Sequence, residues 1–266
     1  MHLTKSQLEN YDRDGFLILP DLVSREEIAL VRGDLARSCA VNDDRVIREK
    51  GTSDVRMIYG LHDLEGPTGS QAIADLSRSP RLLQTAMDVL DDRAYLFHTK
   101  CNMKPAITGQ IWQWHQDMGV WHVDGCPEPR LVTTLLMLDE ATQLGGCLYF
   151  VRGSHREPYI DAPYDDSIAA TQLKAIPLAQ MSDMVSRLGE PVPIVGGPGT
   201  AVLFHPHLIH GSGHNMSTHD RWQLYFVYNA VSNVMSDVAK PRPQWKAARN
   251  RPALTLREKD SILEPA

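Results

Sequence analysis

The chain has 266 residues, of which 42% are hydrophobic and 23% are charged, as in a folded globular protein rather than a disordered or fibrous one. Its net charge of -6 gives no general attraction to nucleic acid or to an anionic membrane, so we expect small molecules as partners. The length suits one large domain, and neither an internal repeat nor a linker divides the sequence. We therefore expect a single domain over residues 1–266; nothing in the sequence indicates an oligomeric state.

The cysteines and the amino terminus indicate a compartment. The four cysteines form no CxxC pair, and MHLTKSQLENYDRDG lacks the apolar core of a signal peptide. No apolar stretch is long enough to span a bilayer. We expect reduced thiols and a cytoplasmic protein.

The first part of the chain, about residues 1–92, is predicted to be mainly helical support. LTKSQLENYDRDG has helical spacing and ends at Gly15, and FLILP then reads as a strand. Ser24 precedes REEIALVRGDLARS, with Glu27 three residues on, which is the pattern of a capping box. These signals predict two helices with a strand between them.

Between residues 42 and 70 the sequence is polar, but VRMIYGLH within it reads as a strand. Residues 70–91 return to helical periodicity, which Pro80 interrupts at a helix boundary or first turn.

From Ala94 onward, short runs rich in aromatic and β-branched residues alternate with turn-forming residues. They include AYLFHTKCNM, QIWQWHQD, RLVTTLLMLD, GCLYFVRG, TAVLFHP and RWQLYFVYNAV. This texture predicts a sandwich or barrel over about 94–235, with the helices covering one face. Within it, about 155–195 is an insertion with a helical stretch, AATQLKAIPLAQMSDMVSRLG, that is either a lid or a structural elaboration.

The segment WQWHQDMGVWH contains a candidate metal-binding pair. If the segment is extended, His115 and Asp117 share a face, because alternate side chains of a strand point the same way. A strand with polar residues facing water shows the same pattern, so a third ligand must lie elsewhere. Five histidines follow in residues 205–219, and one of them would complete a set of two imidazoles and one carboxylate, which favours non-haem Fe(II).

Three ordered motifs carry a family resemblance. WHQD, GGCLYFVRGSH and HGSGHNMSTHDRWQLYFVYNAVSN resemble the motifs of the phytanoyl-CoA dioxygenase family of 2-oxoglutarate-dependent oxygenases, and LTKSQLENYDRDGFLILPDLVSREEI resembles its opening. VRMIYGLH, FHTKCNMKP, WHVDG and FVYNAVSN are most similar to ectoine hydroxylases and related amino acid hydroxylases. The resemblance covers most of the chain.

The resemblance implies a fold, cofactors and site residues. The fold would be mainly β with flanking helices, a double-stranded β-helix of the cupin-like jelly-roll type. The cofactors would be Fe(II), 2-oxoglutarate as cosubstrate, and O2. By motif position, the iron ligands would be His115, Asp117 and His210. The 2-oxoglutarate ligands would be Arg221 with its planar fork, Ser212, Asn102 and, nearby, His98.

The implied reaction is hydroxylation of an unactivated carbon of a free amino acid or similar small polar metabolite, with release of succinate and CO2. Ectoine hydroxylases typically carry Phe and Glu directly after HxD; here Met118 and Gly119 follow, so we expect a rebuilt pocket and doubt ectoine as substrate. The candidate substrate contacts are Met118, Gly119, Trp121, His122 and Arg152. The alternatives are a desaturase or cyclase of a natural-product pathway, an acyl-thioester hydroxylase, and a cupin-like binding module without turnover.

Overall fold

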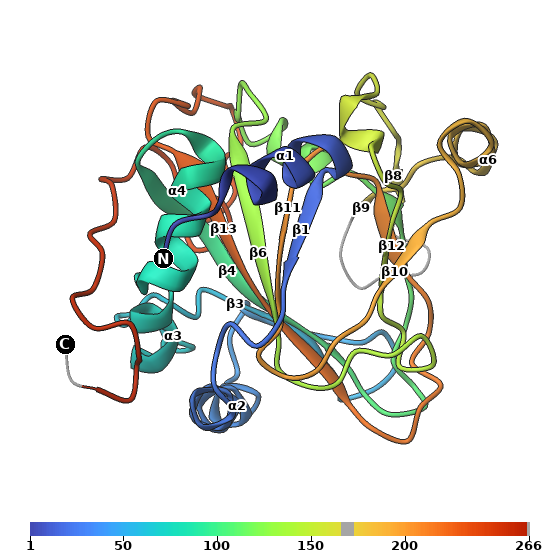
Figure 1. Cartoon of the computed structure of the whole chain (residues 1–266). Coiled ribbons are helices and arrows are strands. Elements are labelled where there is room, and N and C mark those ends of the chain that lie inside the picture. Colours follow the sequence, from blue (N-terminus) through green and yellow to red (C-terminus); the bar gives the residue numbers. More distant parts are fainter. Residues whose placement is uncertain (166–172, 265–266) are drawn as a thin grey trace.

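The computed structural model describes residues 1–165 and 173–264 and consists mainly of two antiparallel sheets (Figure 1). The large sheet has the order β1 (Phe16–Leu19), β11 (Ala201–Phe204), β6 (Leu131–Met137), β13 (Arg221–Ala230), β4 (Ala94–Lys104), β3 (Val55–Tyr59) and β2 (Val46–Arg48). The small sheet has the order β10 (Val192–Ile194), β7 (Leu148–Phe150), β12 (His210–Ser212) and β5 (Trp112–His115). A separate pair joins β8 (Tyr164–Asp165) to β9 (Leu173–Lys174).

Apolar side chains from both sheets pack between them. Leu135 of β6, Phe204 of β11, Phe150 of β7 and Ile194 of β10 belong to one buried cluster. Stacked antiparallel sheets with a shared apolar interior form the jelly-roll architecture, so the predicted fold class is confirmed.

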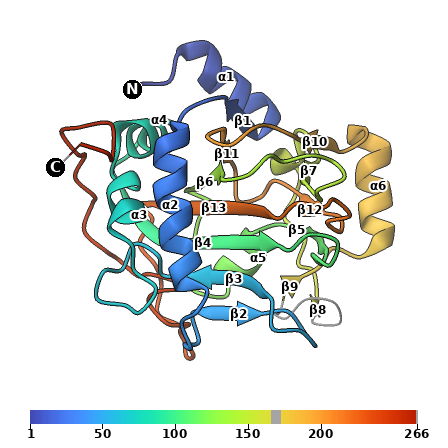
Figure 2. The same ribbon diagram turned by 90° about the horizontal axis from the view of Figure 1, so that it is seen from below.

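The helical elements are α1 (Lys5–Asp14), α2 (Arg25–Ser38), α3 (Gln71–Leu76), a π-helical turn (Pro80–Gln84), α4 (Thr85–Leu90), α5 (Met118–Trp121), a 3-10 turn (Ser154–Arg156) and α6 (Leu178–Leu188). Helices α1 to α4 cover the outer face of the large sheet, whereas α6 lies on the side of the small sheet (Figure 1). Val31 and Leu35 of α2 share a buried cluster with Leu224 and Phe226 of β13, and Figure 2 shows α2 lying across this sheet. Because successive side chains of a strand point to opposite faces, the side chains on the other face of β13 point into the space between the two sheets.

Local signals placed the first elements correctly. The predicted capping box is confirmed, since Glu27 N donates to Ser24 Oγ at 3.3 Å and Ser24 N donates to Glu27 Oε2 at 3.0 Å. Gly15 ends α1 with a φ of 83°, which a residue without a side chain adopts readily. Pro80 begins the π-helical turn, so the helix boundary or first turn predicted at this proline is confirmed. The first 92 residues also supply three strands of the large sheet, β1, β2 and β3.

The helix expected over residues 169–189 is wrong in its first part. Leu173–Lys174 form β9, and α6 begins only at Leu178. Pro177 explains the boundary, because a proline disfavours helical geometry at the residue before it and suits a helix start. Residues 169–172 lie outside the described part of the chain.

After β13 the described chain, residues 231–264, forms neither helix nor strand and passes over the end of the large sheet and the helices (Figure 1). Ala248 N donates to Phe97 O at 2.9 Å, and Leu254 N donates to Ala94 O at 2.8 Å. None of the described helices is both long and apolar enough to cross a membrane.

Candidate active site

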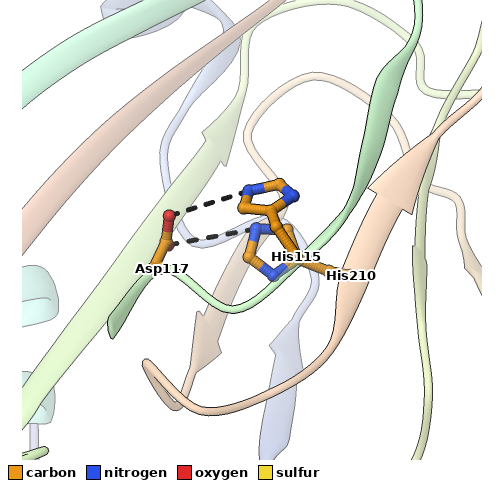
Figure 3. A group of neighbouring side chains, drawn as sticks. All are labelled: His115, Asp117 and His210. Carbon is orange, nitrogen blue, oxygen red and sulfur yellow. Dashed lines mark ion pairs between the residues drawn. The ribbon is translucent and has the colours of Figure 1, made fainter. Parts of the chain in front are cut away.

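The structure brings His115, Asp117 and His210 together (Figure 3). Strands β5 and β12 pair so that His210 lies directly opposite His115, with ring centroids 4.1 Å apart. His115 Nε2 lies 3.9 Å from Asp117 Oδ1, and His210 Nε2 lies 3.9 Å from Asp117 Oδ2. All three side chains are buried, and one ligand atom from each lies within 4.8 Å of the others.

Asp117 reaches this position through a turn. The extended run predicted through Asp117 ends at His115, and Asp117 has helical backbone angles, φ -57° and ψ -36°, at the start of α5. Gln116 holds the turn, since its Nε2 donates to His207 O at 2.8 Å and its Oε1 accepts from Ile160 N at 3.1 Å. His115 is therefore placed by the end of strand β5 and Asp117 by the turn that follows, and strand alternation does not position the Asp117 carboxylate.

Both imidazoles are fixed in the tautomer that a metal requires. His115 Nδ1 lies 2.7 Å from Gln113 O, and His210 Nδ1 lies 2.9 Å from Leu208 O. A carbonyl only accepts, so each Nδ1 carries the proton and each Nε2 lone pair faces Asp117. Burial, and then the neighbouring His210, lower the pKa of His115 to about 3. Both conditions favour a neutral ligand.

Asp117 remains a carboxylate despite its burial. Burial alone raises its pKa, but the positive charge of Lys100 acts in the opposite direction, and the pKa lies below the ordinary value. Two neutral imidazoles and one carboxylate are the donor set that suits non-haem Fe(II) with open positions. The residues present therefore fit the implied metal.

Arg221 lies at the start of β13, beside the same interior space. Its guanidinium is buried, donates to Gly146 O at 2.9 Å and is hydrogen-bonded to Gln223. Gly146 comes from the GGC motif; its φ is 68°, and a Cβ there would lie 2.7 Å from Gly213 O, so the turn that presents this carbonyl requires glycine.

The surroundings of Arg221 fit a dicarboxylate. Ser212 Oγ accepts from Lys104 Nζ at 2.8 Å, and Lys104 pairs with Arg221 in the sheet register. Burial, and then Arg221, lower the pKa of Lys104 to about 6. Arg221 Nε is a buried donor without a hydrogen-bond partner among the described residues. Unsatisfied buried polar atoms in a cavity wall are what a polar ligand would satisfy.

One cavity of about 520 Å³ connects these groups. Its walls include eight predicted site residues, namely His98, Asn102, His115, Asp117, Trp121, His210, Ser212 and Arg221. His98 is held by its Nδ1, which donates to Lys246 O at 3.1 Å. The predicted metal ligands and the residues predicted to hold 2-oxoglutarate thus line the same cavity.

Four predicted substrate contacts do not line this cavity. Met118 is buried in an apolar cluster with Phe97, and the exposed His122 lies 6.2 Å from the Tyr159 ring, centroid to centroid. Gly119 faces the insertion, where a Cβ would lie 3.3 Å from Lys174 Cβ.

The fourth, Arg152, is exposed and donates to Asp14 of α1 at 2.9 Å. Met118, Gly119 and His122 lie outside the cavity wall because α5 is helical: only part of a helix faces inward, and here that part includes Trp121.

The charged and polar residues of the cavity wall that sequence reasoning missed include Lys100, Tyr225, Arg242 and Lys246. Strand alternation could have found the first two, since Lys100 lies two residues from Asn102 on β4, and Tyr225 lies four from Arg221 on β13. Arg242 and Lys246 belong to the irregular carboxyl-terminal segment, for which no periodic signal exists.

Comparison with known proteins identifies the family of this chain. Residues 11–222 match the family model of phytanoyl-CoA dioxygenase (PhyH). Ectoine dioxygenase of Nocardia farcinica is 33% identical over 92% of this chain and 85% of that protein. L-proline trans-4-hydroxylase of Streptomyces griseoviridis is 32% identical over 87% of this chain and 88% of that protein.

A solved structure is also similar along most of the chain. The crystal structure of EctD from S. alaskensis with 2-oxoglutarate and 5-hydroxyectoine superposes with a TM-score of 0.83 and 31% identity, over 96% of this chain and 87% of that one. A further crystal structure of the same protein contains bound Fe and gives a TM-score of 0.81. The chain described here belongs to the phytanoyl-CoA dioxygenase family.

Proposed function

We propose that this protein is an Fe(II)- and 2-oxoglutarate-dependent dioxygenase that hydroxylates an unactivated carbon of a small polar metabolite. The observation that carries the proposal is one cavity with His115, Asp117 and His210 at one place in its wall and Arg221 at another. Relatives named for ectoine and proline hydroxylation support a small-metabolite substrate. The EctD structures, with Fe or with 2-oxoglutarate, support the cofactors.

Each residue has a separate task. His115 Nε2, His210 Nε2 and an Asp117 oxygen hold the metal, while Arg221 and Ser212 bind the distal carboxylate of 2-oxoglutarate through charge-assisted hydrogen bonds. Iron and 2-oxoglutarate, when bound, supply the oxidation of a carbon–hydrogen bond by O2, with succinate and CO2 as co-products. Lys104 holds the Ser212 hydroxyl in place.

The cavity walls favour productive use of the oxidant. Trp112, Trp121, Leu148 and Leu173 supply apolar surface around the polar groups. Such surface excludes water and orients a substrate carbon, so that oxidation is directed to one position. Cytoplasmic location is part of the same proposal, supported by four free cysteines.

The test is a reconstitution. Protein loaded with Fe(II) should consume O2 and form succinate with a panel of amino acids only when 2-oxoglutarate is also present. Product mass then distinguishes hydroxylation, which adds one oxygen, from desaturation or cyclisation, which removes two hydrogens. Oxygen consumption that is indifferent to 2-oxoglutarate, or the absence of 2-oxoglutarate binding to the metal-loaded protein, would overturn the proposal.

A further inference from the structure

Three cations line the part of the cavity that Arg221 does not occupy: Lys100, Arg242 and Lys246. Lys100 belongs to β4, and the other two come from the carboxyl-terminal segment. Lys100 Nζ lies 5.2 Å from the centre of the Tyr225 ring, and Lys246 Nζ lies 5.1 Å from that of Tyr59. Lys100 and the metal ligand Asp117 line the same cavity, so this ammonium group shares the space beside the metal ligands.

Within the described part of the chain, only one of the three cations has an internal counter-ion. Arg242 is held by the buried Asp124, with Nε donating to Oδ1 at 2.7 Å and a second hydrogen bond to Oδ2. Within residues 1–165 and 173–264, no carboxylate lies at ion-pair distance from the ammonium of Lys100 or of Lys246. The described carboxylates in the cavity wall are Asp117, which is a metal ligand in the proposed function, and the exposed Asp44.

The cofactors do not compensate these two charges. In the proposed function the divalent metal and Arg221 contribute three positive charges, and Asp117 with dianionic 2-oxoglutarate contributes three negative ones. Lys100 and Lys246 therefore remain uncompensated beside the remaining space. Placing partly buried ammonium groups together without counter-ions is unfavourable, and an anionic ligand between them removes that penalty.

We infer that the substrate carries a net negative charge: it is an acidic amino acid or another small dicarboxylate, with one acid group held between Lys100 and Lys246. This inference rests on the proposed function and narrows its substrate class. It separates this chain from relatives named for ectoine and proline, which are zwitterions without a net charge. Aromatic rings of Tyr59 and Tyr225 beside the two ammonium groups hold the cations in the cavity when no anion is bound.

Binding of matched ligands to an inactive holoprotein tests the inference. Protein loaded with Mn(II) and 2-oxoglutarate is titrated calorimetrically with L-glutamate against L-glutamine, L-aspartate against L-asparagine, and L-proline. In at least one pair the acid should bind about tenfold or more tighter than its amide, because the two differ in charge and hardly in shape. This comparison needs no variant and so does not depend on a mutant that folds.

Variants then locate the effect. Lys246→Met and Lys100→Met should each reduce the acid-over-amide preference to about threefold or less, whereas Lys246→Arg should retain it. Lys240→Met is the matched control, because Lys240 is exposed, belongs to the same segment and does not line the cavity.

Any of four results would overturn the inference. They are equal binding of acid and amide, tighter binding of proline, no binding of either acid, and a preference that survives in both Met variants. Coupled hydroxylation of a neutral amino acid would do so while leaving the proposed function intact, and failure to bind 2-oxoglutarate would remove the proposed function instead.

Discussion

The two imidazoles of the triad are oriented by the same local device. In each case the Nδ1 proton is donated to the carbonyl of the residue two positions earlier, Gln113 for His115 and Leu208 for His210. Because the acceptor is backbone, the orientation does not depend on which side chain occupies residue 113 or 208. Metal binding therefore depends on the side chains of the three ligands and not on the side chains of residues 113 and 208.

Single alanine substitutions of these ligands should abolish turnover. We expect His115→Ala, Asp117→Ala and His210→Ala each to weaken Fe(II) binding sharply and to remove coupled succinate formation, because each deletes one of three protein ligands. His219→Ala is the matched control, since His219 is an exposed residue of the same late histidine group. Metal titration and succinate assays give the answer, and near-normal activity in His210→Ala would show that another residue is the distal ligand.

Arg221→Lys should separate charge from geometry. Lysine keeps the charge but lacks the planar fork, so we expect the apparent affinity for 2-oxoglutarate to fall about tenfold or more, equivalent to at least ~1.4 kcal/mol. Arg152→Lys is the control, because Arg152 pairs with Asp14 outside the cavity. Succinate formation as a function of 2-oxoglutarate concentration measures the change, and an unchanged dependence would remove Arg221 from the site.

Gly119 is now expected to act through the insertion. Its φ is not in the left-handed region, and a Cβ would contact Lys174 of β9, whose neighbour Leu173 lines the cavity. Gly119→Ala should therefore fold and keep activity within several-fold. Gly119→Phe should displace β9 and lower kcat/KM for the substrate about tenfold or more, with Fe(II) and 2-oxoglutarate still bound. Parental kinetics in a normally melting Gly119→Phe protein would contradict this.

At the scale of elements, one buried carboxylate joins three parts of the chain. Glu27 of α2 accepts from Ser24 N, from Arg81 at 2.7 and 2.9 Å, and from Ile262 N at 2.9 Å. Burial alone raises the pKa of Glu27, but the hydrogen bonds from Arg81, Ser24 and Ile262 outweigh it and lower the pKa to about 2. The carboxylate thus fixes the start of α2, the π-helical turn and the carboxyl-terminal segment together.

Glu27→Gln should destabilise the fold without touching the cavity. The amide keeps the shape but removes the buried charge partner of Arg81, which among the described residues retains only the more exposed Asp260 at 3.1 Å, so we expect a loss of about 2 kcal/mol in the free energy of unfolding. Glu26→Gln, an exposed neighbour in the same helical turn, should change it by less than about 0.5 kcal/mol. Urea unfolding measures both, and equal stabilities of the two variants would show that the three-way contact contributes little.

The elements also show which parts of the fold follow from local sequence. Capping residues and strand alternation are local, so α2 and the inward face of β4 could be predicted from Ser24, Glu27 and Asn102. The first part of the insertion could not, because Leu173 and Lys174 form a strand only by pairing with Tyr164–Asp165. The helical spacing of apolar residues in this stretch does not determine its structure, because pairing with β8 makes it a strand.

For the whole molecule, distant segments complete the cavity. The motifs predicted the metal ligands and Arg221, because the family pattern is short and ordered. Arg242 and Lys246 escaped prediction because they belong to an irregular segment that is placed by contacts with the large sheet, at Phe97 and Ala94, about 150 residues away in the sequence. Charge selection in this cavity is thus a property of the assembled fold.

Neutral buried histidines make the stability of the metal-free protein depend on pH. Burial, acting first in each case, lowers the pKa of His62 to about 4 and that of His115 and His205 to about 3. In the unfolded chain these groups titrate near pH 6.5, so below that pH the unfolded state binds protons that the folded state does not. The contribution of these buried neutral histidines to the free energy of unfolding is therefore complete above pH 6.5, and it is lost as the pH falls toward 4.

We expect the free energy of unfolding to fall by up to about 1.4 kcal/mol per pH unit for each such histidine, measured by urea unfolding of metal-free protein between pH 7.5 and about 4.5. His205→Gln should flatten this slope and the exposed-site variant His219→Gln should not; a parental protein whose stability stays constant over this range would show that these histidines are protonated equally in both states.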